Sequence, residues 1–491
     1  METKAATRYE TVIGVEVHAQ LLTRSKMFCP CSNPTLESPP NTHVDPICLG
    51  MPGVLPVINH EAVNLTIMTG LALNCEIASQ AKFDRKNYHY PDLMKGYQIS
   101  EYDMPICKNG WLEVEVDGEI KRVGITRVHL EEDTARLQHA KDSATGETYS
   151  LVDVNRAGVA LMEIVSEPDI RSAEEARAYL QKLRQILRYI GASRANMEEG
   201  NMRCEPNVSI RLPGAEFGRK VELKNINSFK HAYDAIKFEE QRQAEVLDSG
   251  GRVVQETRGW REDIGQAVPQ RTKEFAEDYR YFPEPDLPPL VINREWVATL
   301  EARMPELPDA RRSRFEAEFG LSEYDARVIA ESRARADFFE DAVAAAGSSE
   351  KAKAVANWLT GDLARLLNAA NVDVQDSKVT PQSLAELIAL QEDGTISGKT
   401  AKAVFEEMFA TGKAPKQVVE EQGLVQITST DEVSASIEKV IAANPKAVED
   451  FRGGKDEAIK FLVGQVMKET RGRARPEVAL QLLREKFGGN P

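Results

Sequence analysis

Five short segments in the first half of the chain alternate hydrophobic and polar residues with a period of two, which is the pattern of β-strands. In the first of them, at 11–18, Ile13, Val15 and Val17 share one face, and Glu16 and His18 share the other. Similar segments with Glu, His, Arg or Lys at polar positions occur at 125–131, 158–165, 208–211 and 220–225. Because residues two apart on a strand point the same way, we predict a sheet with one hydrophobic and one ionisable face.

Two helices interrupt this strand-rich region. The first is predicted to begin after Ser172, which forms a capping-box pattern with Glu175, and to end at Gly191. The second is predicted over about 228–247, before two glycines. From about residue 296 the periodicity becomes helical, and the composition changes again near residue 411. The chain therefore reads as an α+β protein with a sheet domain at 1–295, an all-α helical domain at 296–411 and a small α-helical tail domain at 412–491.

Composition narrows the class of protein. The chain has 491 residues, 42% hydrophobic and 28% charged, with a net charge of −15, so any contact with nucleic acid must use a local basic patch. The sequence has no apolar run of about 18 residues, which predicts no membrane span, and its first residues lack a signal-peptide pattern. Six cysteines are few for this length and predict a reducing, cytoplasmic compartment.

Acidic and imidazole side chains on the predicted polar face are candidate metal ligands. Glu16, His18 and Glu131 are the leading set, because Mg²⁺ prefers carboxylate oxygens and also takes phosphate oxygens of a substrate. A solvated strand face is the alternative interpretation, since alternation by itself is common.

Two further segments are rich in polar groups. Residues 198–204, beginning with Glu198, and the strand that ends at Arg211 combine acids, a turn glycine and arginines, which suits a nucleotide phosphate and its metal. A turn with surface ion pairs explains the same pattern. In 221–228, Lys224 is placed to meet a phosphate as a point charge, or the segment simply caps the following helix.

Three cysteines near the start suggest half of a zinc knuckle. Cys29, Cys31 and Cys48 supply three thiols, and Asp45 stands where a Cys-x-x-Cys pair would place its first thiol. A structural zinc site with three thiolates and one carboxylate is one interpretation, and reduced thiols in a loop are the other.

The C-terminal region is locally basic. Residues 452–486 contain nine Lys or Arg against five Asp or Glu. Arg471, Arg473 and Arg475 form a compact cationic segment between two predicted helices. This contrast with an acidic chain favours a contact with an RNA backbone over a solvated turn.

Long motifs resemble one family. The B subunits of aspartyl/glutamyl-tRNA amidotransferases have similar stretches, in the same order, over nearly the whole chain, at 14–18, 82–88, 97–100, 130–133, 165–171, 197–200, 221–225, 278–286 and 461–467. The resemblance implies a cradle domain whose antiparallel sheet is similar to that of glutamine synthetase. It also implies a ligase that uses ATP and Mg²⁺ to phosphorylate the side-chain carboxylate of Glu-tRNA(Gln) or Asp-tRNA(Asn).

In this family ammonia then displaces phosphate to give Gln-tRNA(Gln) or Asn-tRNA(Asn). Glutamine supplies the ammonia through an amidase partner, the A subunit, and a small C subunit completes a heterotrimer. By resemblance Glu16, His18 and Glu131 map onto the metal-site motifs. Residues assigned to the nucleotide and acyl-phosphate side are Glu163, Glu222, Arg211, Lys224, Glu198 and Asn225. Family members with the zinc knuckle usually have Cys where this chain has Asp45.

Two other function classes remain open. One is a stand-alone ATP-dependent ligase acting on a small acid, although a small substrate does not need a basic helical tail. The other is a noncatalytic tRNA-binding scaffold subunit, although the acids and imidazole of the polar face argue for chemistry. ATP hydrolysis measured with and without Glu-tRNA separates the three.

Overall fold

The chain forms two compact units, Met1–Leu307 and Pro308–Pro491. The computed structural model describes residues 8–35, 37–272, 278–425, 430–452, 455, 457–470 and 473–487. Among these residues, no helix is both long and apolar enough to cross a membrane.

The first unit contains the strands. Their bounds are β1 (Glu10–Gln20), β2 (Glu76–Ile77), β3 (Gln80–Ala81), β4 (Asp84–Asn87), β5 (Tyr97–Ser100), β6 (Cys107–Val116), β7 (Glu119–Glu132), β8 (Arg136–Lys141), β9 (Thr148–Asp153), β10 (Ala160–Ser166), β11 (Met202–Arg211), β12 (Val221–Lys224), β13 (Glu256–Arg261), β14 (Gln266–Thr272), β15 (Phe282–Pro283) and β16 (Leu290–Val291). Its helices are α1 (His60–Ala72), α2 (Ala173–Tyr189), α3 (Phe229–Asp248) and α4 (Arg294–Glu301), with a short turn η1 (Val154–Arg156).

Most of these strands join one sheet in the order β14-β13-β12-β11-β1-β10-β7-β5-β4-β15, with β6 on β7 and β2 on β6. The pairs are antiparallel, as predicted, except that β12 pairs with β13 in parallel. This exception follows from the connection, because helix α3 carries the chain from β12 back to the start of β13.

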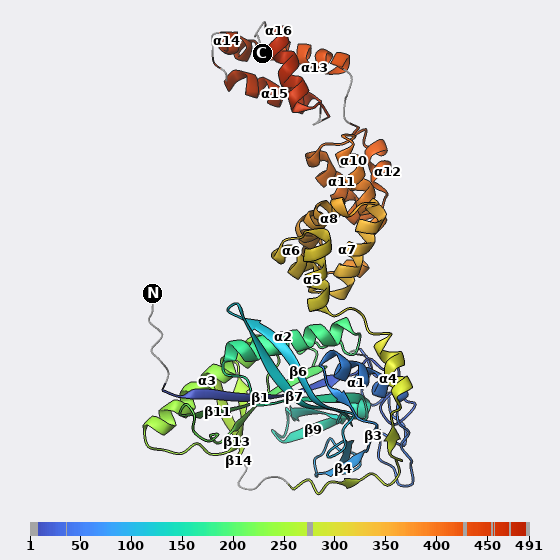
Figure 1. Ribbon diagram of the computed structural model, residues 1–491, viewed down its shortest axis with the longest axis vertical. Helices are drawn as coiled ribbons and strands as arrows, with labels where there is room; N and C mark the ends of the chain where they lie inside the picture. Colours follow the sequence, from blue (N-terminus) through green and yellow to red (C-terminus); the bar gives the residue numbers. More distant parts are fainter. Residues whose placement is uncertain are drawn as a thin grey trace. The chain divides into compact units, whose positions relative to one another are not determined.

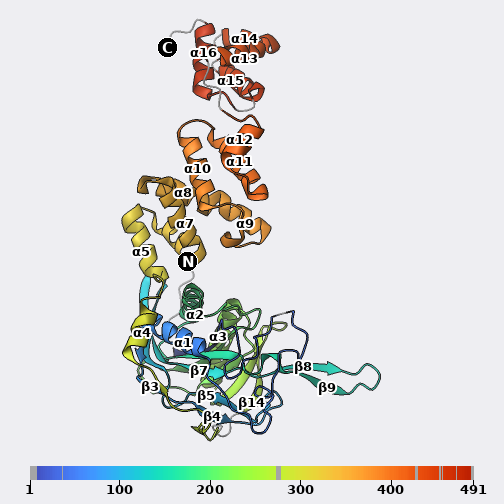
Figure 2. The same ribbon diagram turned by 90° about the vertical axis from the view of Figure 1, so that its right-hand side faces the viewer.

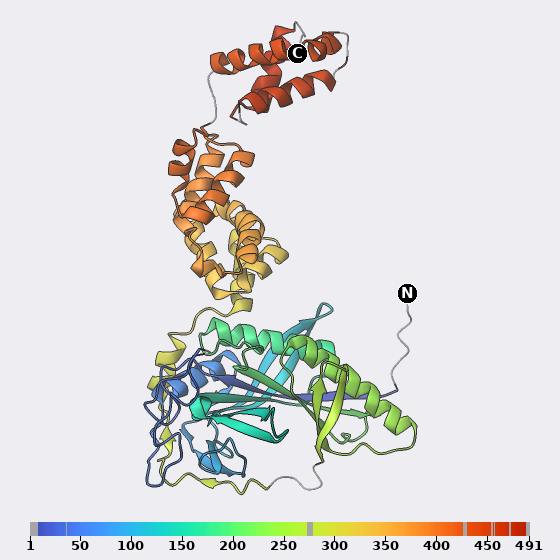
Figure 3. The same cartoon turned by 180° about the vertical axis from the view of Figure 1, so that it is seen from behind.

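Each long helix begins at the residue that the sequence indicates. Ser172 caps α2 by accepting from Glu175 N (3.1 Å), and Ser228 caps α3 by accepting from His231 N (3.0 Å). In a complete capping box the Glu175 side chain would accept from the backbone N–H of Ser172. It accepts instead from Arg171 N (2.8 Å), one residue earlier, so only the Ser172 half of the predicted box forms. Figures 1 and 3, which are views from opposite directions, both show α2 and α3 lying along the sheet.

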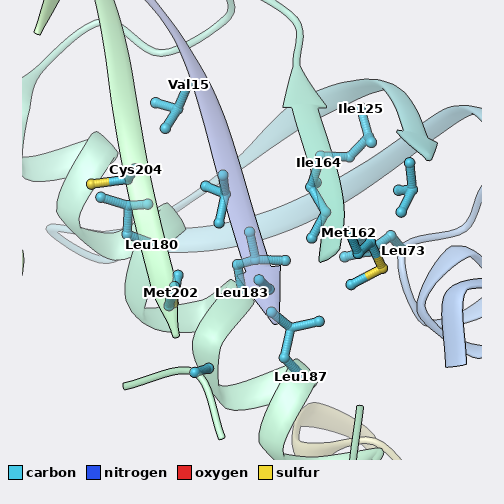
Figure 4. Packing of buried hydrophobic residues seen from close by; sticks show 14 of the residues in the cluster. Val15, Leu73, Ile125, Met162, Ile164, Leu180, Leu183, Leu187, Met202 and Cys204 are labelled. Carbon is cyan, nitrogen blue, oxygen red and sulfur yellow. The ribbon is translucent and has the colours of Figure 1, made fainter. Parts of the chain in front are cut away.

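The hydrophobic face of the sheet packs against α2. In Figure 4 the strand residues Val15, Met162, Ile164, Met202 and Cys204 lie close to the α2 residues Leu180, Leu183 and Leu187. All of these side chains are buried in one core. The other face of the same strands is therefore left for the polar side chains, as the alternation predicts.

Helix α1 was not expected from the sequence. Ten of its residues are buried, from Ala62 to Ala72, so it has no polar stripe that would reveal a helical period. Its start is marked by Asn59, whose side chain accepts from Glu61 N and Ala62 N. A helix buried on most sides is hard to distinguish from a buried strand by periodicity alone.

Strands β8 and β9 form a separate hairpin that pairs only with itself and projects from the sheet in Figure 2. The Pro-rich segment after residue 278 pairs with the edge of the main sheet through β15 on β4, and it forms a separate two-stranded sheet through β16 on β3. Arg85 fixes this segment through two hydrogen bonds to Glu284 (2.7 and 2.8 Å).

The second unit is helical. Its helices are α5 (Pro308–Phe319), α6 (Glu323–Ala330), α7 (Arg333–Ala346), α8 (Ala352–Trp358), α9 (Ala364–Ala370), α10 (Pro381–Glu392), α11 (Gly398–Thr411), α12 (Pro415–Glu421), α13 (Thr430–Ala443), α14 (Pro445–Arg452), α15 (Glu457–Glu469) and α16 (Pro476–Lys486). Short 3₁₀ or π turns are η2 (Ser349–Lys351), η3 (Leu359–Leu363) and η4 (Val374–Asp376).

The helices of the second unit pack around two hydrophobic cores. One spans Phe315 to Val419, with Leu424 against it, and the other spans Val433 to Leu483. An α+β chain with helical C-terminal parts is thus confirmed. The domain boundaries at 295 and 411 stay predictions; α12, which follows the second boundary, packs in the first of these cores.

Candidate active site on the polar face of the sheet

A row of ionisable residues crosses four neighbouring strands. Strand pairing places His18 of β1 opposite Arg203 of β11 on one side and Glu163 of β10 on the other. Glu163 in turn lies opposite His129 of β7. Because paired residues on neighbouring strands point to the same face, this register brings together residues more than a hundred positions apart in sequence.

His18, Glu131 and Glu163 form the tightest cluster in this row. His18 Nε2 lies 3.3 Å from Glu163 Oε2 and 3.6 Å from Glu131 Oε1, and one ligand atom from each of the three lies within 4.8 Å of the others. Both carboxylates are buried. Two hard oxygens and one imidazole nitrogen, facing one point, suit a divalent cation such as Mg²⁺ that completes its shell with water and phosphate oxygens.

Charges inside the cluster shift its pKa values in opposite directions. Burial alone would lower the pKa of His18, but its hydrogen bond to Glu163 and the nearby carboxylates raise it to about 9. Burial raises the pKa of Glu131. Burial also opposes ionisation of Glu163, yet the two histidines hold its pKa well below the usual range. The carboxylates that attract a proton to His18 Nε2 would likewise attract a divalent cation.

His129 has a different protonation state from His18. Burial lowers its pKa to about 4, so it is neutral near pH 7. Its Nδ1 accepts from Arg127 Nε (3.3 Å), which leaves the proton on Nε2, 3.5 Å from Glu163 Oε2. The Nε2–H of His129 therefore faces the Glu163 carboxylate and helps to keep this carboxylate ionised.

Lys86 is the main site residue that the sequence prediction did not single out. It lies on β4, which pairs with β5. Strand β5 in turn pairs with β7, with Ser100 opposite Glu131 of the cluster. Burial alone would lower the pKa of Lys86, but Glu131 and Glu163 raise it above the usual range. The Lys86 Nζ also lies 5.1 Å from the centre of the Tyr279 ring. The alternation of the four-residue strand β4 is too short to be a strong signal, but Lys86 does lie in the motif at 82–88 that resembles the family.

A second polar cluster lies one strand pair further along the sheet. Lys224 Nζ lies 3.0 Å from Glu205 Oε2 and 3.4 Å from Glu222 Oε1, and these carboxylates raise its pKa against the effect of burial. Thr257 donates to Glu222 (2.7 Å). Glu205 was not among the predicted residues, although it has the same alternation as Arg203 two positions before it.

Glu16 lies between the two clusters. Its Oε1 accepts from Asn207 Nδ2 (3.0 Å), and burial, with Glu163 and Glu205 nearby, raises its pKa. The structure thus groups Glu163 with His18 and Glu131, where the sequence placed Glu16, and puts Glu16 beside Glu205.

Asp133 lies at the edge of the cluster that contains His18. It is buried and bonded to Arg203 (3.0 and 3.2 Å) and Gln20 (2.8 Å). Burial opposes its ionisation, but Arg203 and Arg156 lower its pKa to about 2. This ion pair fixes the Arg203 guanidinium next to His18.

Three other predicted residues do not reach these clusters. Arg211 lies at the far end of β11, where it bonds to Glu10 (2.7 Å) and to Ala215 O (2.9 Å). Glu198 is exposed in the turn before β11, and Asn225 is exposed directly after β12. Their assignment to the nucleotide stays a prediction.

The candidate zinc ligands are partly assembled. Ligand atoms of Cys29, Asp45 and Cys48 lie within 4.8 Å of one another, and the Lys26 ammonium lies 3.5 Å from Cys48 Sγ. The hydrogen bond from Cys29 is the main cause that lowers the pKa of Cys48 to about 6. A thiolate beside a second thiol and a carboxylate fits the donor set of zinc. Cys31, the fourth candidate, does not belong to this closest group. Burial raises the pKa of its thiol, and the nearby Cys48 raises it further.

The predicted tRNA-binding arginines lie between α15 and α16. Arg471 lies outside the described residues. Arg473 Nε donates to Thr470 O (3.2 Å) at the end of α15, and Arg475 is exposed at the start of α16.

Comparison with known proteins defines the class to which this fold and site belong. Residues 11–298 match the GatB/GatE catalytic domain, and residues 337–487 match the GatB domain. The chain therefore belongs to the GatB family.

Similar full-length proteins are named as the B subunit of aspartyl/glutamyl-tRNA(Asn/Gln) amidotransferase. The protein of that name from Carboxydothermus hydrogenoformans is 56% identical over 480 residues, covering 98% of this chain and 99% of its own length. Those from Dehalococcoides mccartyi and Moorella thermoacetica are 53% and 54% identical, each covering 98% of this chain.

Proposed function

We propose that this chain is the B subunit of an aspartyl/glutamyl-tRNA amidotransferase, a carbon–nitrogen ligase with glutamine as nitrogen donor. Its polar sheet face would be the site where a tRNA-linked carboxylate is activated with ATP. The observation that carries this proposal is the cluster of His18, Glu131 and Glu163 with Lys86 beside it. Family membership over nearly the whole chain supports the substrate class.

The chemistry explains why such a face suits the reaction. A carboxylate reacts poorly with ammonia because oxide is a poor leaving group. Phosphorylation of the side chain of Glu-tRNA(Gln) or Asp-tRNA(Asn) makes phosphate the leaving group, and ammonia then gives Gln-tRNA(Gln) or Asn-tRNA(Asn). Phosphoryl transfer needs little covalent help from a protein; it needs charge neutralisation and alignment of donor and acceptor.

His18, Glu131 and Glu163 would hold Mg²⁺, which when bound neutralises phosphate charge and aligns the oxygens. Lys86, beside them, carries a positive charge that the Glu131 and Glu163 carboxylates stabilise, and it would face the transferred phosphoryl group. Lys224, between Glu205 and Glu222, is placed to do the same at the second cluster. Glu16 lies between the clusters and would be a further candidate ligand of Mg²⁺.

The remaining assignments are part of the same proposal. Arg211, Glu198 and Asn225 would contact the nucleotide only if ATP extends beyond the second cluster. Zinc would be structural at Cys29, Cys31, Asp45 and Cys48. The partners would be the amidase, or A, subunit of the enzyme and its small C subunit, and a cytoplasmic location stays a prediction.

Two alternatives receive less support. A stand-alone ligase for a small acid does not require residues 337–487, which match the GatB domain. A noncatalytic scaffold does not require buried carboxylates and histidines converging on one point.

The test is transamidation with purified partners and each misacylated tRNA. The wild-type enzyme should form amidated aminoacyl-tRNA only with ATP and Mg²⁺. Glu131→Gln should lower ATP-dependent activity at least about 100-fold, because loss of a metal ligand should cost at least as much as loss of its supporting partners. Glutamine hydrolysis by the partner should stay measurable. Glu119→Gln, exposed at the start of β7 and outside every segment assigned to the site, is the control. Wild-type rates in Glu131→Gln would refute the metal assignment.

A further inference from the structure

Four tyrosine rings form a continuous row that begins at the candidate active site. In the order in which each ring lies against the next, they are Tyr88, Tyr279, Tyr281 and Tyr102. The first three meet edge to face, with ring centres 5.8 Å apart for Tyr88 and Tyr279 and 6.1 Å apart for Tyr279 and Tyr281. Because the Lys86 Nζ lies over the Tyr279 ring, the row is in contact with the cation of the site.

The other end of the row is a stacked pair of rings. Those of Tyr281 and Tyr102 are parallel within 10°, with centres 4.2 Å apart. The hydrogen bonds between Arg85 and Glu284 fix the segment that carries Tyr281 to the sheet. Tyr102 is 52% exposed, although Glu101 directly before it is buried. A ring that served only to pack the Pro-rich segment would be buried, so this exposed and supported ring offers an aromatic surface to a ligand.

The stacked pair lies close to the candidate metal ligands. Strand β5 pairs with β7 at Ser100 and Glu131, and Tyr102 lies two residues beyond Ser100. The charges of the site also act on the second ring of the pair: burial raises the pKa of Tyr281, Lys86 lowers it, and Glu131 raises it again. A ligand stacked on the pair would therefore lie at the rim of the site where a carboxylate is activated.

The covalent structure of the substrate indicates which group reaches this rim. In an aminoacyl-tRNA the amino acid is esterified to the ribose of the terminal adenosine. Only the ribose, the ester and a short side chain separate the adenine base from the reacting carboxylate, so the base must lie beside the metal site whenever the carboxylate is bound there. Proteins commonly bind unpaired bases of RNA by stacking them on aromatic side chains.

We propose that the stacked pair of Tyr102 and Tyr281 binds the terminal adenine base of the misacylated tRNA. This inference rests on the proposed function and names the residues that place the reacting carboxylate. The adenine of ATP has the same chemistry. The tRNA is the better source, because a ribose and three phosphates separate the adenine of ATP from the phosphate oxygens that a metal would hold.

The experiment uses the full chain with the purified A and C subunits and compares three variants. Tyr102→Leu removes the exposed ring and Tyr102→Phe keeps it. Tyr149→Leu is the matched control, because Tyr149 is 48% exposed on the separate β8–β9 hairpin. Initial rates of amidation give kcat and KM for Glu-tRNA at saturating ATP, and KM for ATP at saturating Glu-tRNA. A second substrate is Glu-tRNA whose terminal residue lacks its base, made by ligation of a chemically glutamylated dinucleotide.

We expect Tyr102→Leu to raise the KM for Glu-tRNA at least about fivefold, which is the size of effect that loss of one stacked base has in other proteins. The kcat and the KM for ATP should stay within about twofold of wild type, because the polar sheet face is unchanged. Tyr102→Phe and Tyr149→Leu should behave as wild type. On the base-free substrate, wild type and Tyr102→Leu should have the same kcat/KM, because the contact that the variant lacks is already absent.

A higher KM for ATP with an unchanged KM for Glu-tRNA would overturn the proposal and assign the pair to the adenine of ATP. Unchanged KM values for Tyr102→Leu, or an equal loss on the base-free substrate, would also overturn it and leave Tyr102 a packing role. If the wild-type enzyme did not amidate Glu-tRNA, the proposed function would fail. Binding of an RNA trinucleotide ending in adenosine, compared with its base-free counterpart, would then still decide whether Tyr102 binds the base.

Discussion

At the scale of single residues, Glu101 shows how burial makes stability depend on pH. Its side chain is buried, Oε2 accepts from Leu130 N (3.1 Å) and Ile106 N (3.3 Å), and Oε1 has no partner among the described residues. Burial raises its pKa from 4.5 to about 8. The unfolded chain therefore releases this proton at lower pH than the folded chain, so its contribution to stability falls as pH rises from about 4.5 to 8.

Glu101→Gln should remove this dependence, because glutamine resembles the protonated acid and keeps an acceptor for both backbone donors. We expect the free energy of unfolding to rise by at least about 1 kcal/mol at pH 9 and to change little at pH 5. Urea unfolding of both proteins at the two pH values measures this difference. Equal effects at both pH values would show that the change acts through packing rather than ionisation.

The cysteine cluster gives a second prediction for single residues. If Cys29, Cys31, Asp45 and Cys48 hold zinc, metal analysis should give one zinc per chain, and Cys48→Ser or Cys31→Ser should abolish it. Because a structural metal stabilises only the folded state, both changes should also lower the melting temperature. Cys75→Ser, which changes a thiol outside this group, serves as the control. Zinc-free wild-type protein of normal stability would favour reduced thiols instead.

At the scale of elements, the segment between α15 and α16 is expected to bind tRNA backbone. A sheet face can contact only the acceptor end of a tRNA, so selection among tRNAs requires a second contact. Changing Arg471, Arg473 and Arg475 to alanine should weaken tRNA binding. It should also reduce the slope of log affinity against log salt concentration, by up to about three if all three contact phosphates.

The matched control removes three exposed lysines elsewhere in the same unit, at 353, 402 and 416. This variant has the same net charge but should keep most of the salt dependence. Filter binding over a range of salt concentrations compares the two, and ATP binding should be unaffected in both. Identical slopes for both triple variants would show that the effect is one of net charge and that the segment is only a solvated turn.

At the scale of the whole molecule, the chain should lack glutaminase activity by itself. The sequence shows no Ser-Ser-Lys pattern of an amidase, and Cys48, whose pKa is lowered to about 6, is only 5% exposed. A nucleophile that substrate cannot reach does not hydrolyse glutamine. Incubation of the pure chain with glutamine should release no ammonia above background, whereas addition of the amidase partner should. Release by the pure chain would contradict the proposed division of labour.

The alternation along each strand predicted correctly which face of the sheet its residues take. Alternation placed Glu16 and His18 opposite Val15 and Val17, and Ser172 marked the start of α2. Local patterns succeed here because side-chain direction and helix capping depend on residues a few positions apart. Long motifs also indicated the family, to which the chain belongs.

Which polar residues meet depends on the order and register of the strands, and the sequence pattern did not predict either. Pairing of β1 with β10 placed Glu163, rather than Glu16, against His18, and pairing through β5 brought Lys86 to the same point. The same long-range packing buried α1 on most sides and set β12 parallel to β13. A period of two fixes the face of a strand residue but not its neighbour, because strand order and register depend on packing between segments far apart in the chain.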